Sequence, residues 1–191
     1  MRKLSTFLIA LAVVTPAYAD TVTSTFDFGP AYPERIAFLM LTCKTCHGAR
    51  SVSVNGIELK RDVTSGDAEV AEIWSAPLPD GTGALDVTIN GDYPLAEAVA
   101  GMGAANNPPE PHPISRAIST LTGQHEYAID VKDGEVVLSV SSGGDTFAKS
   151  GEPPSLEAQI GHLRSAAWNI KRDSALTISG PSSVSVVAVY R

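Results

Sequence analysis

The sequence predicts an α+β fold, with short helices around the Cys43-x-x-Cys46-His47 segment and a β-rich C-terminal half. Two observations lead to this prediction. Apolar and polar residues alternate from Tyr127 to Val140 and largely alternate from Leu176 to Tyr190, which is the period of a half-buried strand. Helical signals are fewer than strand signals, and most of them lie in the N-terminal half.

The chain begins with the features of a secretory signal peptide. Two basic residues at positions 2–3 precede an apolar run at 7–14, and the small-residue triplet 17–19 follows. The apolar run is too short to span a membrane, and no later stretch approaches the roughly 20 apolar residues that a span requires. We therefore predict a signal peptide at 1–19 and a single exported domain at 20–191. That domain is expected in the periplasm or otherwise outside the cytoplasm, without a stable membrane span.

The predicted mature chain is acidic. Without residues 1–19, the 14 Lys and Arg residues fall to 12 against 21 Asp and Glu, which gives a net charge of −9. A negative field disfavours nucleic acid and anionic membrane surfaces as partners.

The segments that flank the cysteines are predicted in order. Thr21 to Phe28 alternates and is interpreted as an edge strand or an extended leader. Pro33 suits the first turn of a helix, and the run from Ile36 to Leu41 is apolar on every side, so that periodicity does not separate a buried helix from a buried strand. The position of Pro33 favours a helix that runs into the cysteines.

Three strand pairs are predicted further along the chain. The first is a hairpin of 51–54 and 57–59 around the favoured turn pair Asn55-Gly56. The second is a hairpin of 127–131 and 136–140 around Asp133-Gly134. The third pairs 176–178 with 184–190.

Three further helices are predicted, at 67–74, at 95–100 and at 155–170, the last beginning at the N-cap Ser155. The Pro-rich loop 103–113 excludes helix and central strand, and we take it as a sub-boundary within the domain. We detect no internal repeat in the sequence.

The chemistry of the chain is concentrated in the segment Cys43-Lys44-Thr45-Cys46-His47-Gly48, which holds both cysteines. Two thiols separated by two residues can add to the two vinyl groups of a haem, and the next residue then lies under the iron as an imidazole ligand. In an exported chain this spacing predicts covalent attachment of haem c.

On Cys43, Cys46 and His47, with Gly48 and the preceding apolar segment, the chain resembles the c-type cytochromes. The resemblance covers about a tenth of the mature chain and concerns the attachment site alone. It implies that Cys43 and Cys46 bond the haem, that His47 ligates the iron and that Met102, between two glycines, supplies the distal ligand. His112, held between two prolines, is the alternative distal ligand, whereas His125 and His162 are expected at the surface.

This resemblance predicts an exported mono-haem protein that carries electrons to or from a redox partner protein, or senses redox state or a gas. No catalytic residue is assigned. Two other interpretations of Cys43 and Cys46 remain open. One is a thioredoxin-like redox site, and the other is a local disulfide in a β-rich periplasmic binding or structural module. A zinc site would need a second pair of ligands, and His112, His125 and His162 do not provide one.

Overall fold

We describe a computed structural model of the 191-residue chain. The residues that it describes are 18–31, 35–44, 46–66, 69–78, 83–94, 98–106, 117–121, 124–142, 147–148, 154, 156–160, 163–181 and 184–190.

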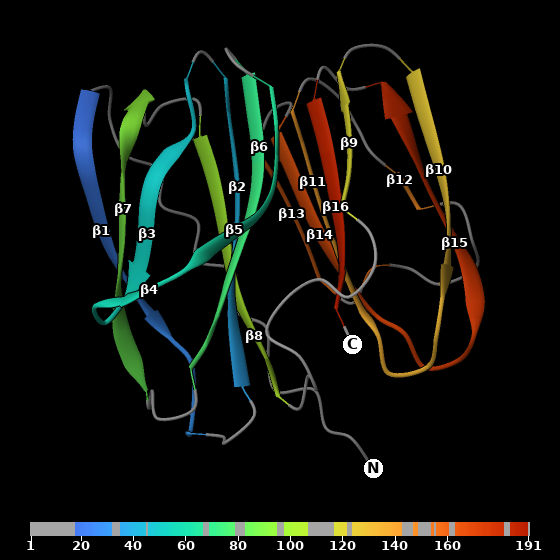
Figure 1. The fold of residues 1–191 in the computed structure, drawn as a ribbon, viewed down its shortest axis with the longest axis horizontal. Coiled ribbons are helices and arrows are strands. Elements are labelled where there is room, and N and C mark those ends of the chain that lie inside the picture. Colours follow the sequence, from blue (N-terminus) through green and yellow to red (C-terminus); the bar gives the residue numbers. More distant parts are fainter. Residues whose placement is uncertain are drawn as a thin grey trace.

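The described residues form four antiparallel β-sheets stacked face to face, seen edge-on in Figure 1. In the order of the stack these are sheet 1 (β1-β7-β3-β4), sheet 2 (β5-β6-β2-β8), sheet 3 (β13-β14-β11-β16-β9) and sheet 4 (β10-β15-β12). The strands are β1 (Tyr18–Asp27), β2 (Arg35–Lys44), β3 (Ala49–Val54), β4 (Ile57–Glu58), β5 (Lys60–Ser65), β6 (Glu69–Pro77), β7 (Ala84–Pro94), β8 (Ala98–Asn106), β9 (Ala117–Leu121), β10 (Gln124–Val131), β11 (Val136–Ser142), β12 (Phe147–Ala148), β13 (Leu156–Ile160), β14 (Leu163–Asn169), β15 (Ser174–Pro181) and β16 (Val184–Tyr190).

Each pair of neighbouring sheets encloses its own hydrophobic core. In β2, Leu39 and Leu41 face the core between sheets 1 and 2, whereas Phe38 and Met40 face the core between sheets 2 and 3. A third core lies between sheets 3 and 4. Strands of an inner sheet are therefore buried on both faces, and both faces must be apolar.

The α+β prediction is wrong, because the described part of the chain is β-structure and contains no helix. The apolar run 36–41, predicted as a helix, belongs to β2, and its continuous hydrophobicity reflects burial on both faces of an inner strand. The predicted helix 67–74 falls mainly on β6, 95–100 ends in β8, and 155–170 is divided between β13 and β14. Among the described residues no helix has the length and apolarity to cross a membrane.

One predicted hairpin is confirmed and two are wrong in their pairing. β3 pairs with β4 around Asn55-Gly56, where both residues have positive φ as the predicted turn requires. The other predicted strands exist, but β10 pairs with β15 in sheet 4, whereas β11 and β16 pair with each other in sheet 3. The turn at Asp133-Gly134 therefore connects two different sheets.

The predicted edge strand at 21–28 is confirmed as β1, which lies at one edge of sheet 1. Phe26 and Phe28 face the core, while the threonines face outward and bond to β7. Thr21 Oγ1 donates to Asn90 Oδ1 at 2.8 Å, and Thr25 Oγ1 donates to Asp86 Oδ1 at 3.0 Å. The alternation thus corresponds to one buried and one solvated face.

The same strand order occurs twice in the chain. Sheet 1 has the order β1-β7-β3 and sheet 4 the equivalent order β10-β15-β12, while β5-β6-β2-β8 of sheet 2 corresponds to β13-β14-β11-β16 of sheet 3. The first sandwich, sheets 1 and 2, comes from residues 18–106, and the second, sheets 3 and 4, from residues 117–190. The two sandwiches pack through sheets 2 and 3.

The register relates individual positions of the two sandwiches. Trp74 on β6 pairs with Leu39 on β2, and Trp168 on β14 pairs with Val137 on β11. Both tryptophans face the core of their own sandwich. The predicted loop 103–113 begins in β8, and its remainder lies outside the described residues. The prediction of one domain with a sub-boundary there stays a prediction.

Candidate functional site

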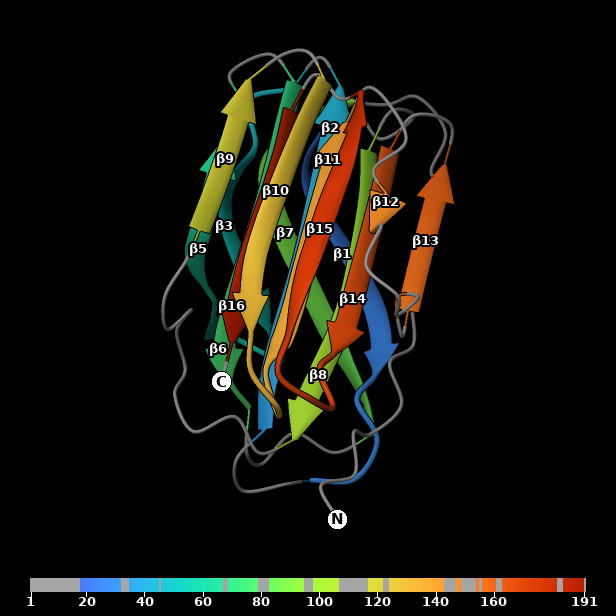
Figure 2. The same ribbon diagram turned by 90° about the vertical axis from the view of Figure 1, so that its right-hand side faces the viewer.

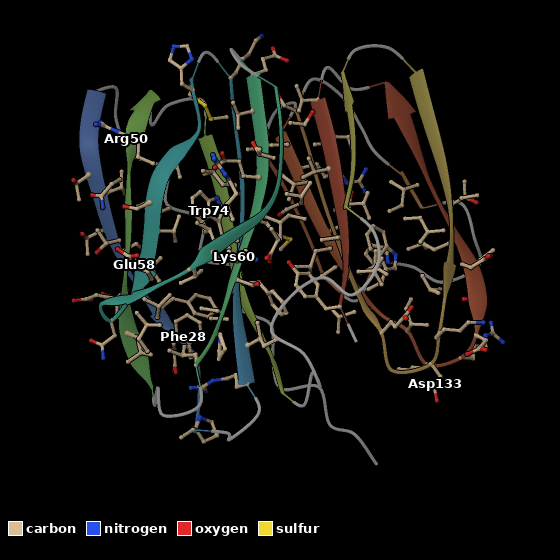
Figure 3. All side chains as sticks on the ribbon, in the orientation of Figure 1. Phe28, Arg50, Glu58, Lys60, Trp74 and Asp133 are labelled. Atoms are coloured by element: carbon tan, nitrogen blue, oxygen red, sulfur yellow. A yellow bond between two sulfur atoms is a disulfide. The ribbon has the colours of Figure 1, made fainter. Side chains whose placement is uncertain are left out.

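The two cysteines are bonded to each other. Cys43 lies near the end of β2, Cys46 lies in the connection to β3, and their Cα atoms are 6.0 Å apart. Both side chains belong to the core of the first sandwich, with exposed fractions of 0 % and 2 %. A buried disulfide therefore joins the end of β2 to the start of the connection that leads to β3 (Figure 3).

The prediction of covalent haem c is wrong for this structure. Both sulfurs that would bond the vinyl groups are joined to each other and packed in the core, while His47 is exposed. Nor does the cytochrome resemblance extend to the surroundings, which are helix-free β-sheets. The described residues include no cluster of three or more His, Cys, Asp or Glu side chains that could hold a metal ion.

None of the other methionine and histidine residues considered as iron ligands is placed beside this loop in the described part of the chain. Met102 lies in the middle of β8, where it pairs with Leu39, and not in a loop. His125 is on β10 in the second sandwich, where it pairs with Gly180. His112 and His162 lie outside the described residues.

A buried carboxylate lies beneath the disulfide-closed connection. Glu72 is on β6, is 1 % exposed and faces the core of the first sandwich. Its Oε2 accepts hydrogen bonds from the Ala49 amide and from the Trp74 Nε1–H, both at 3.0 Å. Its Oε1 accepts bonds from Arg61 at 3.1 Å and from Thr64 Oγ1 at 3.3 Å. Four donors thus compensate for the burial of this charge.

The Glu72 carboxylate also lies so close to the backbone of Gly48 that it restricts this position to glycine. Gly48 has a φ of +81°, and a Cβ placed there would lie 2.5 Å from Glu72 Oε1 and 3.2 Å from Val70 Cγ1. Only glycine permits both this backbone conformation and this close approach. Arg61, which donates to the same Oε1, has its guanidinium carbon 5.3 Å from the centre of the Trp74 ring.

The sequence interpretation missed Glu72, because residues 67–74 were predicted as a helix in which a glutamate is ordinary. The usable signal was a single carboxylate within the apolar run Val70-Ala71-Glu72-Ile73-Trp74. Such a residue on an inner strand must be buried, and a buried carboxylate requires donors.

Two other buried polar groups connect elements of the fold. Arg35 donates to the backbone oxygens of Phe28, Pro30 and Leu78, so it joins the chain after β1 to the end of β6. Tyr190 on β16 donates to Asp62 Oδ2 at 2.6 Å, which links the second sandwich to β5. Burial, and then the negative charge of Asp62, raise the pKa of Tyr190 well above its usual value.

The burial of the sulfurs bears on the thioredoxin-like alternative. Thiol–disulfide exchange requires a sulfur that an attacking thiolate can reach. Neither Cys43 nor Cys46 is accessible in this way, and the element after Cys46 is β3, not the long helix of a thioredoxin-like site. The disulfide is positioned to hold the connection 44–48.

Comparison of the chain with protein-family models, with curated proteins and with solved structures finds no match in any of the three.

Proposed function

We propose that this chain is an exported β-rich binding module, in which the Cys43–Cys46 disulfide and Glu72 hold Lys44 and residues 46–50 in place as a recognition loop. The supporting observation is the comparison of the two sandwiches. With Trp74 equivalent to Trp168, the register makes Cys43 equivalent to Ser141 and Glu72 equivalent to Ala166. The second sandwich has the same strand order without either feature, so this topology does not require them.

The outward side chains of this loop suit an acidic ligand. Lys44, His47 and Arg50 are exposed, and Arg50 lies at the upper end of the first sandwich in Figure 3. Two positive charges and an imidazole within seven residues form a local basic site on a chain that is acidic as a whole. A loop fixed from below also loses little conformational entropy when a ligand binds.

The proposal is tested with a defined probe. A hexaglutamate peptide is titrated at low salt into the isotope-labelled exported protein, and backbone amide resonances are followed. We expect the largest shifts within residues 44–50. Replacing Lys44 and Arg50 together with alanine should weaken binding about three- to tenfold, which is the effect of two exposed charge pairs at low salt.

The matched control replaces Lys171 and Arg172, an exposed basic pair in the second sandwich, and changes the net charge equally. If both double variants weaken binding to the same extent, the peptide senses net charge alone and the recognition loop is disproved. Replacing Cys43 and Cys46 together with serine leaves every charge of the chain in place. It should still weaken binding, because it removes the disulfide that holds the loop.

A further inference from the structure

The two inner sheets, sheets 2 and 3, differ in strand order at one edge, and this difference points to a second binding surface. In sheet 3, β16 is covered along its outer edge by β9. In sheet 2 the equivalent strand is β8, and among the described residues only β2 pairs with it. The outer backbone groups of β8 therefore have no described strand to pair with, although the fold provides one at the equivalent place.

The packing of the two sandwiches repeats this asymmetry. β9 lies against β5, the edge strand of sheet 2 that faces it across the central core. At the opposite edge of the central core, β8 lies against β13 and β14. No described strand extends sheet 2 beyond β8 to lie against β13, whereas β9 extends sheet 3 beyond β16 and lies against β5. Figure 2 shows β9 and β13 at opposite sides of the stack.

We propose that the outer edge of β8 is an acceptor site for an extended, uncharged peptide segment of a partner protein, which adds to sheet 2 as β9 adds to sheet 3. This inference is independent of the recognition loop. β8 reads Ala-Val-Ala-Gly-Met-Gly-Ala-Ala-Asn and has neither a charge nor a proline, the usual devices that prevent strand addition at an edge. Main-chain hydrogen bonds supply the affinity in this mode of recognition.

The chemistry of the occupant follows from β9. That strand, Ala117-Ile-Ser-Thr-Leu121, is uncharged, contains both apolar and hydroxyl side chains and runs antiparallel to β16. It ends shortly before β10 begins. The same spacing before β1 falls at residues 11–15, which lie outside the described residues. These residues belong to the predicted signal peptide, and the predicted cleavage after Ala19 would leave this place to a segment of a partner.

The first test is amide hydrogen exchange of the exported protein alone. Backbone amides alternate in direction along a strand, so about every second amide of β8 should point to the open edge. We expect these amides to exchange at least about tenfold faster than those of β16, which is paired on both sides. Equal protection of β8 and β16 would show that other residues of the chain already cover this edge, and would overturn the proposal.

The second test adds a synthetic peptide with the uncharged sequence of residues 117–121, blocked at both termini so that it carries no charge. The peptide should slow exchange in β8, whereas the same peptide with proline in place of Ser119 should not. Protection that appears elsewhere but not in β8 refutes the site. Protection of β8 that rises with protein concentration in the absence of peptide also refutes it, since the occupant would then be a second copy of this chain.

A pair of substitutions provides the genetic control. Gly101→Pro and Met102→Pro each remove one amide of β8, and neighbouring amides point to opposite edges. One variant therefore loses a hydrogen bond to β2 and is destabilised, while the other loses only an outward donor. The variant that keeps the circular dichroism and unfolding midpoint of the parent should lose peptide binding. Unchanged binding in that variant would contradict strand addition at β8.

Discussion

Alanine at Gly48, compared with alanine at Gly56, measures how closely the recognition loop is held on the buried carboxylate. The two glycines have nearly the same φ, +81° and +80°. A Cβ at Gly56 would meet no atom within 4 Å, whereas a Cβ at Gly48 would lie 2.5 Å from Glu72 Oε1. Because the backbone cost is common to both variants, their difference reports the side-chain contacts at Gly48, of which the one with Glu72 is the closest.

The expected destabilisation has two parts, the cost of the left-handed backbone conformation and the cost of displacing the Glu72 carboxylate. The left-handed conformation costs a residue with a Cβ about 1–2 kcal/mol, which is the whole effect expected for Gly56→Ala. In Gly48→Ala the carboxylate must also move, although four donors hold it, and weakening one hydrogen bond to a charged group costs about 2 kcal/mol more. For a chain of this size we expect the melting temperature of Gly48→Ala to lie about 4–8 °C below that of Gly56→Ala.

The assay is thermal and urea unfolding of both variants beside the parent, with the disulfide intact. In a Glu72→Ala background the cost of Gly48→Ala should fall close to that of Gly56→Ala, because only the contact of 3.2 Å with Val70 Cγ1 then remains. Equal destabilisation in the Glu72 parent would refute the close approach of the loop to the carboxylate.

Three further predictions concern Glu72, the disulfide and Tyr190. Glu72→Gln replaces one acceptor oxygen by a donor and should lower the free energy of unfolding by about 2–3 kcal/mol; a loss below about 0.5 kcal/mol would contradict the four-donor site. Replacing Cys43 and Cys46 with serine should cost about 2 kcal/mol from loop entropy, measured by urea unfolding, and should speed amide exchange at residues 44–49; unchanged exchange there would show that the disulfide does not hold the loop. Because the pKa of Tyr190 is raised in the folded protein, protonated Tyr190 contributes its full stabilisation below about pH 10, the usual tyrosine pKa. This stabilisation is lost as the pH rises towards the higher pKa of the folded state. The stability difference between the parent and Tyr190→Phe should therefore be constant up to about pH 9 and shrink as the pH rises above about 10, and a constant difference across about pH 10–11 would argue against a raised pKa of Tyr190.

Local patterns in the sequence identified several strands correctly. Alternation predicted β1 and the strands now seen as β10, β11, β15 and β16, because each of these segments has its own two-residue period. The Asn55-Gly56 turn was predictable because positive φ at both positions is a local property of those residues. The spacing of Cys43 and Cys46 likewise indicated a chemically linked pair, although it did not identify the linkage.

Only the tertiary structure decided what covers each strand. The run 36–41 is apolar on every side because sheets 1 and 3 lie on its two faces, and a buried helix would show the same composition. Pairing in the C-terminal half also depends on distant segments, since successive strands there often alternate between sheets 3 and 4. The repeated strand order and the support of the loop by Glu72 depend on contacts between residues far apart in the chain. A pattern of neighbouring residues carries no direct record of such contacts.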